Sequence, residues 1–253
     1  MELINKLYVV CKKERNFNMR TKKFGFTLAE VLITLGIIGV VAAMTIPTLI
    51  SNTNSAKFKS QYKKTLSTLN QAALMGTAQY DLDYASITTA CTGGGTEKPD
   101  VTASMCALIN GTLSGATYYA TAANMKIPGT STAYSISSNL TNVAGTDMVA
   151  YQLADGSVIA FDKDLKSCTL APGDPITSAS LNSCRGFIDV NGPTLPNKEV
   201  RCSTGSAAVA SSVGTCIVRN NAADMGDIFP VVFHDGTVEP ITDAARYVLN
   251  QSK

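Results

Sequence analysis

The chain has 253 residues, of which 45% are hydrophobic and only 16% charged, and its formal net charge is +2. This composition excludes a globally disordered chain and a strongly basic nucleic-acid-binding protein. The chain holds one histidine, His234, which excludes a multi-histidine metal centre.

Charge is distributed unevenly along the chain. Residues 1–25 carry seven basic and two acidic side chains, a net of +5, whereas the rest of the chain carries a net of −3. A basic N-terminal segment ahead of a weakly acidic body is typical of a membrane-inserted chain with its N-terminus in the cytoplasm.

An apolar segment follows at residues 26–50, FTLAEVLITLGIIGVVAAMTIPTLI, and Glu30 is its single charge. As an α-helix it would be about 38 Å long, which exceeds the roughly 30 Å of a hydrocarbon core. It is too long for the apolar region of a secretory signal peptide and lacks a small-residue cleavage site at its end. We therefore predict a retained membrane anchor.

Glu30 is the unusual residue of this segment, because a carboxylate inside a membrane is costly and usually marks a function. One interpretation places Glu30 at the start of the helix, where the helix dipole stabilises an anion. The other pairs it with an ammonium group. A cut after Gly25 would provide one at Phe26, on the same or a neighbouring chain.

Residues 22–31, KKFG followed by FTLAEV, resemble the processing site of type IV pilins and type II secretion pseudopilins. The resemblance covers about residues 19–75. It implies cleavage by a prepilin peptidase between Gly25 and Phe26 and N-methylation of Phe26. It also implies a helical filament with the apolar helices at its centre, and Pro47 lies where this family often has a helix-kinking proline. In such a bundle we expect Glu30 of one subunit to meet the Phe26 ammonium of the next and to set the axial register.

The resemblance further implies where the chain resides and what it binds. We expect a single-pass protein of the inner membrane with its C-terminal domain outside the cytoplasm, which later joins a pilus or pseudopilus. The expected partners are membrane lipid, the prepilin peptidase, the inner-membrane assembly platform, and copies of this chain or related pilins. The main hypothesis is a structural subunit and not an enzyme. The alternatives are a minor pilin that binds DNA, a surface or secreted cargo, and a membrane-anchored periplasmic enzyme.

Four segments are expected: a leader at 1–25, a membrane and filament-core helix at 26–50, an amphipathic continuation at 51–84 and a β-rich globular domain at 85–253. Met19 is an alternative start that would shorten the leader to seven residues.

The helical pattern continues beyond Pro47 and should end between Gly76 and Asp83. The apolar stripe repeats at intervals of three or four residues and comprises Phe58, Tyr62, Leu66, Leu69 and Ala73. Four lysines near its start either contact lipid phosphates or an acidic neighbour, or form a solvated face: Lys57, Lys59, Lys63 and Lys64.

Beyond residue 85 the composition turns to Ser, Thr, Gly, Ala and Asn. Residues 148–153 and 157–161 flank an Asp-Gly turn and predict a β-hairpin, as do residues 231–233 and 237–239. Residues 111–146 are predicted to form a surface loop region with short strands. The expected fold class is therefore α+β and pilin-like: a long N-terminal helix packed on a small antiparallel sheet with disulfide-closed loops.

The cysteines support an oxidising compartment for this domain. Cys11 lies in the leader, and removal of the leader leaves an even six. Successive pairs are separated by 15, 16 and 14 residues, which favours nearest-neighbour pairing. These pairs are Cys91–Cys106, Cys168–Cys184 and Cys202–Cys216. A cysteine metal site is disfavoured because no CxxC pair occurs.

Three smaller patterns have mainly structural interpretations. Asp189 and Asn191, with Asp224 and Asp227, are candidate oxygen ligands for calcium, but an Asx-type turn is the preferred interpretation, so no metal or cofactor is predicted. His234 precedes Asp235 and is interpreted as a turn or strand residue, because no GxSxG motif accompanies it. The glycines at 93–95 lack the lysine of a P-loop and predict a flexible loop.

Overall fold

The computed structural model describes residues 25–125, 128, 148–176, 181, 184–204 and 216–251. The leader up to residue 24, including Met19 and Cys11, lies outside the described residues. The chain divides into two compact units, one that ends at Ile46 and one that begins at Pro47.

Helix α2, Leu28–Tyr80, is assigned continuously through Pro47 and belongs to both units. Its end at Tyr80 lies within the predicted interval. In the second unit its buried side chains include the whole predicted stripe, from Phe58 to Ala73. The 3–4 spacing therefore identified the face that packs on the rest of the domain.

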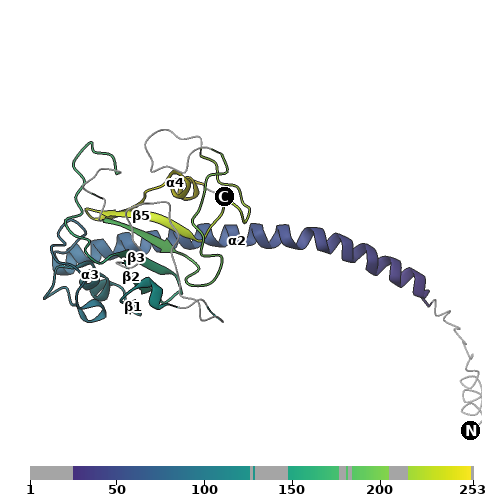
Figure 1. Ribbon diagram of the computed structural model, residues 1–253, viewed down its shortest axis with the longest axis horizontal. Helices are drawn as coiled ribbons and strands as arrows, with labels where there is room; N and C mark the ends of the chain where they lie inside the picture. The colour runs from purple at the N-terminus through teal and green to yellow at the C-terminus, as the bar shows by residue number, and fades with distance from the viewer. Residues whose placement is uncertain are drawn as a thin grey trace, which may run out of the picture. The chain divides into compact units, whose positions relative to one another are not determined.

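The described residues form one antiparallel sheet whose strands lie in chain order (Figure 1). The strands are β1 (Thr117–Tyr119), β2 (Met148–Gln152), β3 (Val158–Asp162), β4 (Arg185–Asp189), β5 (Ile228–His234) and β6 (Thr237–Pro240). Together with α2 and the disulfides, this sheet confirms the predicted α+β, pilin-like fold.

One face of the sheet packs against the second half of α2. The ring of Tyr62 on α2 stacks on Phe229 of β5 with centroids 4.1 Å apart. Tyr84, just beyond α2, donates its hydroxyl to the Leu69 carbonyl at 2.9 Å, and its ring meets Phe233 edge-on. Every residue of β5 is buried, so this strand is covered on both faces.

Both predicted hairpins are present. Strands β2 and β3 pair with Ala150 opposite Ala160, and the turn between them contains Gly156 at a φ of 87°. Strands β5 and β6 pair with Phe233 opposite Val238, and β6 ends at Pro240. In the second turn Asp235 has a φ of 46°. Positive φ values are typical of Asp-Gly hairpin turns, so the turn residues agree with both hairpins.

Strand β4 was not predicted. It ends at Asp189, the first residue of the Asp-x-Asn pattern, and it pairs with both β3 and β5. The turn begins only after Asp189. Much of the loop predicted at 111–146 lies outside the described residues, and its described part holds β1 and the short 3-10 helix η2 (Ala122–Asn124).

Two short helices complete the second unit, α3 (Met105–Thr112) and α4 (Asp243–Asn250). Helix α4 follows edge strand β6, and its N-cap Thr242 accepts a hydrogen bond from the Ala245 amide. The outer edge of β6 is closed by Asn70 of α2, whose Oδ1 accepts from the Val238 amide at 2.6 Å. This bond satisfies one outward-facing donor of the edge strand within the chain itself.

Candidate functional site

The first turn of α2 contains Glu30 in a reciprocal hydrogen-bond arrangement with Thr27. The Thr27 amide and hydroxyl both donate to Glu30 Oε2 at 2.8 Å, and the Glu30 amide donates to Thr27 Oγ1 at 3.2 Å. This is a capping box, in which a Thr and a Glu three residues later satisfy each other's backbone donors. The Thr-x-x-Glu spacing at residues 27–30 is the sequence signal that predicts such a capping box.

The structure thus places Glu30 at the amino end of α2, where the carboxylate faces the positive end of the helix dipole. The sequence-based interpretation that puts Glu30 at a helix start describes this position.

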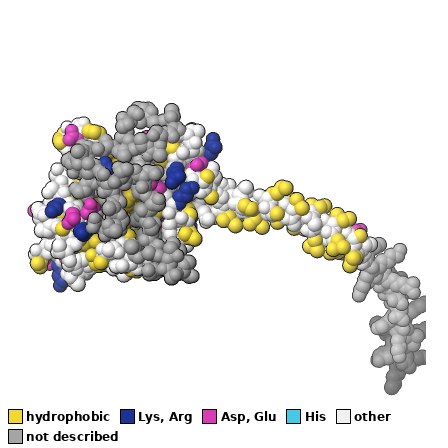
Figure 2. All heavy atoms as spheres, in the orientation of Figure 1, with side chains coloured by type: hydrophobic (Ala, Val, Ile, Leu, Met, Phe, Trp, Pro, Cys, Tyr) yellow, Lys and Arg dark blue, Asp and Glu magenta, His cyan; other side chains and the backbone are white. Residues whose placement is uncertain are grey.

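From Leu28 onward the first unit is apolar and exposed. By length and composition, α2 contains an apolar stretch that could cross a membrane. None of the 18 most apolar consecutive residues is buried. Figure 2 shows hydrophobic side chains along this half of α2. The large exposed hydrophobic side chains described in this unit are Phe26, Leu28, Val31, Leu32, Ile33, Leu35, Ile37, Ile38, Val40, Val41, Met44 and Ile46.

A comparison with protein families identifies this segment. Residues 20–46 match the family model described as the prokaryotic N-terminal methylation motif. This motif is the prepilin-type cleavage and methylation signature of type IV pilins and pseudopilins, and its presence at residues 20–46 supports a pilin- or pseudopilin-like protein. The match includes Gly25, Phe26 and Glu30 and ends one residue before Pro47. Neither a search of curated proteins nor one of solved structures found a match to this chain.

The lysines near the start of the amphipathic stripe mostly contact their own chain. Lys59 and Lys63 donate to the side chain and the carbonyl of Gln251 at 2.7 and 2.9 Å. Lys64 forms an ion pair with Asp155 at 2.9 Å. Burial, and then the charge of Lys63, lower the pKa of Lys59. Lys59 and Lys63 therefore link α2 to Gln251, and Lys64 links it to the β2–β3 turn. Neither sequence-based interpretation included these contacts within the chain.

The six cysteines of the second unit form three disulfides, Cys91–Cys106, Cys168–Cys184 and Cys202–Cys216. The Cα atoms of each pair are 5.2 to 5.8 Å apart, within the usual range. These are the nearest-neighbour pairs that the spacing favours. Each closes a loop of about 15 residues, which stabilises the fold by about 3 kcal/mol in the chain-entropy model.

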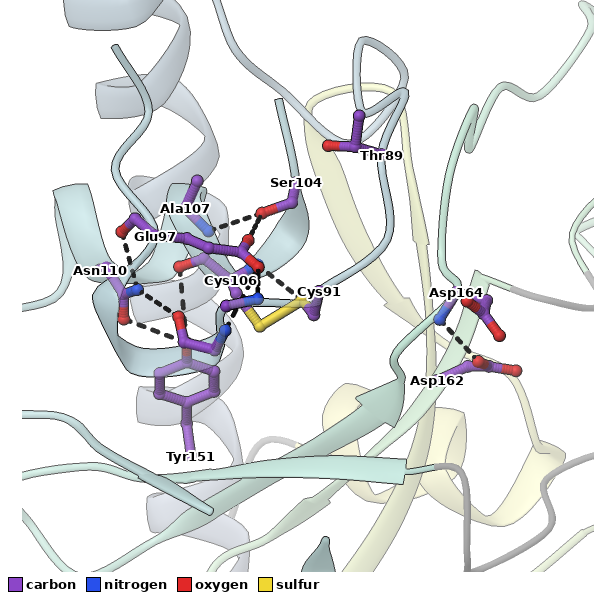
Figure 3. Close-up of a disulfide and its surroundings, with 12 residues drawn as sticks. Thr89, Cys91, Glu97, Ser104, Cys106, Ala107, Asn110, Tyr151, Asp162 and Asp164 are labelled. Carbon is purple, nitrogen blue, oxygen red and sulfur yellow. Dashed lines mark hydrogen bonds between the residues drawn. A yellow bond between two sulfur atoms is a disulfide. The ribbon is translucent and has the colours of Figure 1, made fainter. Parts of the chain in front are cut away.

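The loop after Cys91 differs from the flexible loop that its glycines predict. It forms the 3-10 helix η1 (Gly94–Thr96), and Gly94 adopts a φ of 55° with the Tyr118 ring against it. The buried carboxylate of Glu97 accepts from the Gly93 and Gly94 amides through Oε1 and from the Ser104 hydroxyl through Oε2. Figure 3 shows Glu97 beside the Cys91–Cys106 disulfide. One acidic side chain therefore orders the loop and ties it to the start of α3.

The acidic residues considered for calcium bind backbone groups and a hydroxyl in the structure. Asp189 Oδ1 accepts from the Asn191 amide at 3.0 Å, which is the Asx-type turn. Asp227 accepts from the Asn197 and Lys198 amides, whereas Asp224 accepts from a serine hydroxyl elsewhere. Within the described residues, these three aspartates do not converge as a cluster of candidate ligand atoms.

His234 is the last residue of β5 and is buried. Its Nδ1 lies 3.0 Å from Asp235 Oδ2, and Thr237 Oγ1 lies 3.4 Å from its Nε2. In the part of the chain that the structure describes, no serine hydroxyl is hydrogen-bonded to this imidazole. Its position at a strand end next to a turn agrees with the structural interpretation.

Proposed function

We propose that the chain is a structural subunit of a type IV pilus-like or type II secretion pseudopilus filament. In this proposal a prepilin peptidase cuts between Gly25 and Phe26, Phe26 is N-methylated, and the subunit assembles through α2. The observation that carries the proposal is the exposed apolar first part of α2, residues 28–46, which has Glu30 as its only charge and lies within the matched prepilin-type motif at residues 20–46. The four segments 1–25, 26–50, 51–84 and 85–253 are its proposed working parts.

The geometry at Thr27 supports a role for Glu30 in assembly. Both bonds from Thr27 end on Oε2, so Oε1 is available to a second donor. The ammonium of a cleaved Phe26 on the next subunit is such a donor, and a buried ion pair is a plausible device for setting register. Pairing would then fix how far one helix advances along another.

Location and partners follow from the same proposal. The helix holds the subunit in the inner membrane with residues 85–253 outside the cytoplasm, where the disulfides form. The assembly platform then transfers it from lipid into a bundle of like helices. In that bundle, copies of this chain or related pilins cover the apolar side chains that lipid covered before.

Mass spectrometry of the N-terminal peptide from the native protein tests the proposal. We expect a chain that begins with N-methyl-Phe26 and is recovered in sheared filaments. A native chain that keeps its leader and stays monomeric would refute the filament role.

A further inference from the structure

We propose that the membrane-anchored chain holds the headgroup of an anionic phospholipid in a cavity beside residues 51–58 of α2. The cavity has a volume of about 300 Å³, and all its described lining residues belong to the second unit. Helix α2 forms one wall, and the loops at residues 191–196 and 222–225 form the other. The inference rests on the membrane anchor of the proposed function and names the class of lipid that the anchored subunit selects.

The cavity lies close to the end of the apolar segment in the chain. Its lining begins at Ser51, directly after the exposed apolar residues Leu49 and Ile50. On a continuous α-helix, residues 51–54 lie within about 6 Å of Ile50 along the axis. The polar region of a bilayer extends roughly 5–8 Å beyond the hydrocarbon core on each side. When the apolar segment spans the hydrocarbon, the first residues of this wall therefore lie among the lipid headgroups.

Lys57 makes the cavity attractive to an anion. Among the described lining residues it is the one with a charged side chain. Lys59, Lys63 and Lys64 bind Gln251 or Asp155, whereas the described residues give the Lys57 ammonium no hydrogen bond or ion pair. Side chains on an α-helix point toward its amino end, so the long stem of Lys57 reaches back toward the membrane. A lysine ammonium at this level is a natural ligand for a phosphate.

Uncharged donors surround the same space. The Oγ atom of Ser51 is buried and has no hydrogen-bond partner within the described residues, although Ser51 lines the cavity. A buried hydroxyl without a partner is costly, and a phosphate oxygen accepts the bond that Ser51 lacks. Asn54 on α2 and Thr194 on the opposite loop also line the cavity, so both walls contribute polar side chains.

The loop wall is held in place by bonds within the chain. Asn191 Nδ2 donates to the carbonyls of Thr194 and Leu195 at 2.9 and 3.1 Å. The Asp227 carboxylate accepts from the amides of residues 197 and 198 at 3.0 and 2.7 Å. A wall that is already ordered reduces the entropy cost of binding. Leu195 is 65% exposed and offers an apolar contact to the first carbons of an acyl chain.

A second cavity on α2 provides an internal comparison. It has a volume of about 490 Å³ and is lined by both Lys64 and Asp155, which form an ion pair at 2.9 Å. Its lining on α2 begins at Lys64, about 21 Å beyond Ile50 along the helix. A neutralised lysine beyond the level of the headgroups should not select an anionic lipid, so Lys64 is the matched control for Lys57.

The test measures lipid binding to the full chain in detergent. Phosphatidylglycerol and phosphatidylcholine with the same acyl chains are each titrated in, and native mass spectrometry counts the lipids that the chain retains. We expect phosphatidylglycerol to bind at least about fivefold more tightly, which is the effect of one lysine near an anionic lipid surface. Equal affinity for the two lipids would overturn the proposal.

Two pairs of variants locate the lipid in the cavity. Lys57→Gln should abolish the preference for phosphatidylglycerol, whereas Lys64→Gln should keep it. Ser51→Ala leaves the charge unchanged and should weaken retention of phosphatidylglycerol at least about threefold, because it removes the buried hydroxyl. Ser60→Ala, at an exposed position of α2 outside the lining, should retain the lipid like the parent chain.

These variants also provide the outcomes that contradict the site. A Lys57→Gln chain that keeps the preference, or an equal loss in Lys64→Gln, would show attraction to surface charge without a site. Unchanged retention in Ser51→Ala would place the lipid outside the cavity. None of these measurements requires cleavage after Gly25 or assembly, so a negative result would leave the filament role intact.

Discussion

The two parts of helix α2 differ in whether the folded chain covers their apolar side chains. In the second unit the stripe from Phe58 to Ala73 packs on the sheet of the same chain. Between Leu28 and Ile46 the apolar side chains surround the helix and remain exposed. A one-sided stripe is satisfied by folding, whereas an apolar surface on all sides requires lipid or other helices. The helix therefore has one apolar surface that folding covers and one that the folded chain leaves exposed.

The largest expected effect concerns Glu30, the one charge within residues 28–46 of α2. Glu30→Ala, Glu30→Lys and Glu30→Gln should each leave membrane insertion intact and lower the yield of sheared filaments at least about tenfold, because none offers a carboxylate to the Phe26 ammonium. Fractionation of membranes and immunoblotting of sheared filaments measure both quantities.

The Glu30→Gln variant isolates the charge, since an amide oxygen still accepts hydrogen bonds from Thr27. Glu239→Ala, on exposed Glu239 of β6, is the matched control and should assemble normally. Normal filament yield from Glu30→Gln would show that pairing by charge is not what sets the register.

The next effect compares one substitution on each surface. Leu69 is 0% exposed and Leu35 is 59% exposed. Leu69→Ala should reduce the free energy of unfolding by about 2–5 kcal/mol, since it leaves a cavity under the sheet. Leu35→Ala should change it by less than about 0.5 kcal/mol. Denaturant unfolding of the full chain in detergent measures both, and equal losses would contradict the division into two surfaces.

The sequence predicted those parts of the fold that local signals specify. The stripe on α2 follows a 3–4 spacing, and the two hairpins follow Asp-Gly turns between β-branched and aromatic residues. Six cysteines at nearly even separations favoured the pairs that the structure contains. Each of these signals is contained within a few turns or strands of the chain.

The structural features that the sequence did not predict depend on contacts between distant residues, or on segments where strand and turn patterns overlap. Strand β4 begins with Arg185 and Gly186 and is followed by the turn at Asn191. These polar and turn-forming residues gave no strand pattern in the sequence. The strand forms because it pairs with β3 on one side and β5 on the other. Glu97 orders a glycine-rich loop only because α3 supplies Ser104. The lysines of α2 find partners at Gln251 and Asp155, about 90 to 190 residues away in sequence. Spacing along the chain does not report such pairs.

A smaller effect concerns the pH dependence of the folded domain. Burial raises the pKa of Asp227 above its ordinary value of 3.8, although the Lys198 and Asn197 amides partly oppose this. A raised pKa in the folded state means that the stabilising contribution of this group is complete below pH 3.8 and is lost as the pH rises through the folded pKa.

The variant Asp227→Asn should remove this decrease of stability with rising pH. Thermal unfolding between about pH 3.5 and 6 should show a shallower fall in Tm with rising pH than the parent chain shows. Asp224→Asn, in which the replaced carboxylate binds a serine hydroxyl, is the control and should keep the slope. A parent and an Asp227→Asn variant with parallel profiles would assign the slope to other groups.

The smallest effect is expected at the ion pair between Lys64 and Asp155. The Lys64 side chain is 63% exposed, and its Nζ lies 2.9 Å from Asp155 Oδ2. Exposed pairs contribute about 0.2–1 kcal/mol, so Lys64→Ala should lower the free energy of unfolding by no more than that. Asp155 also accepts from the amide and hydroxyl of Ser157, so the turn keeps most of its bonds when the lysine is removed. Denaturant unfolding of the full chain measures this change. A decrease in the free energy of unfolding as large as that of Leu69→Ala would mean that the β2–β3 turn is held to α2 mainly by this ion pair.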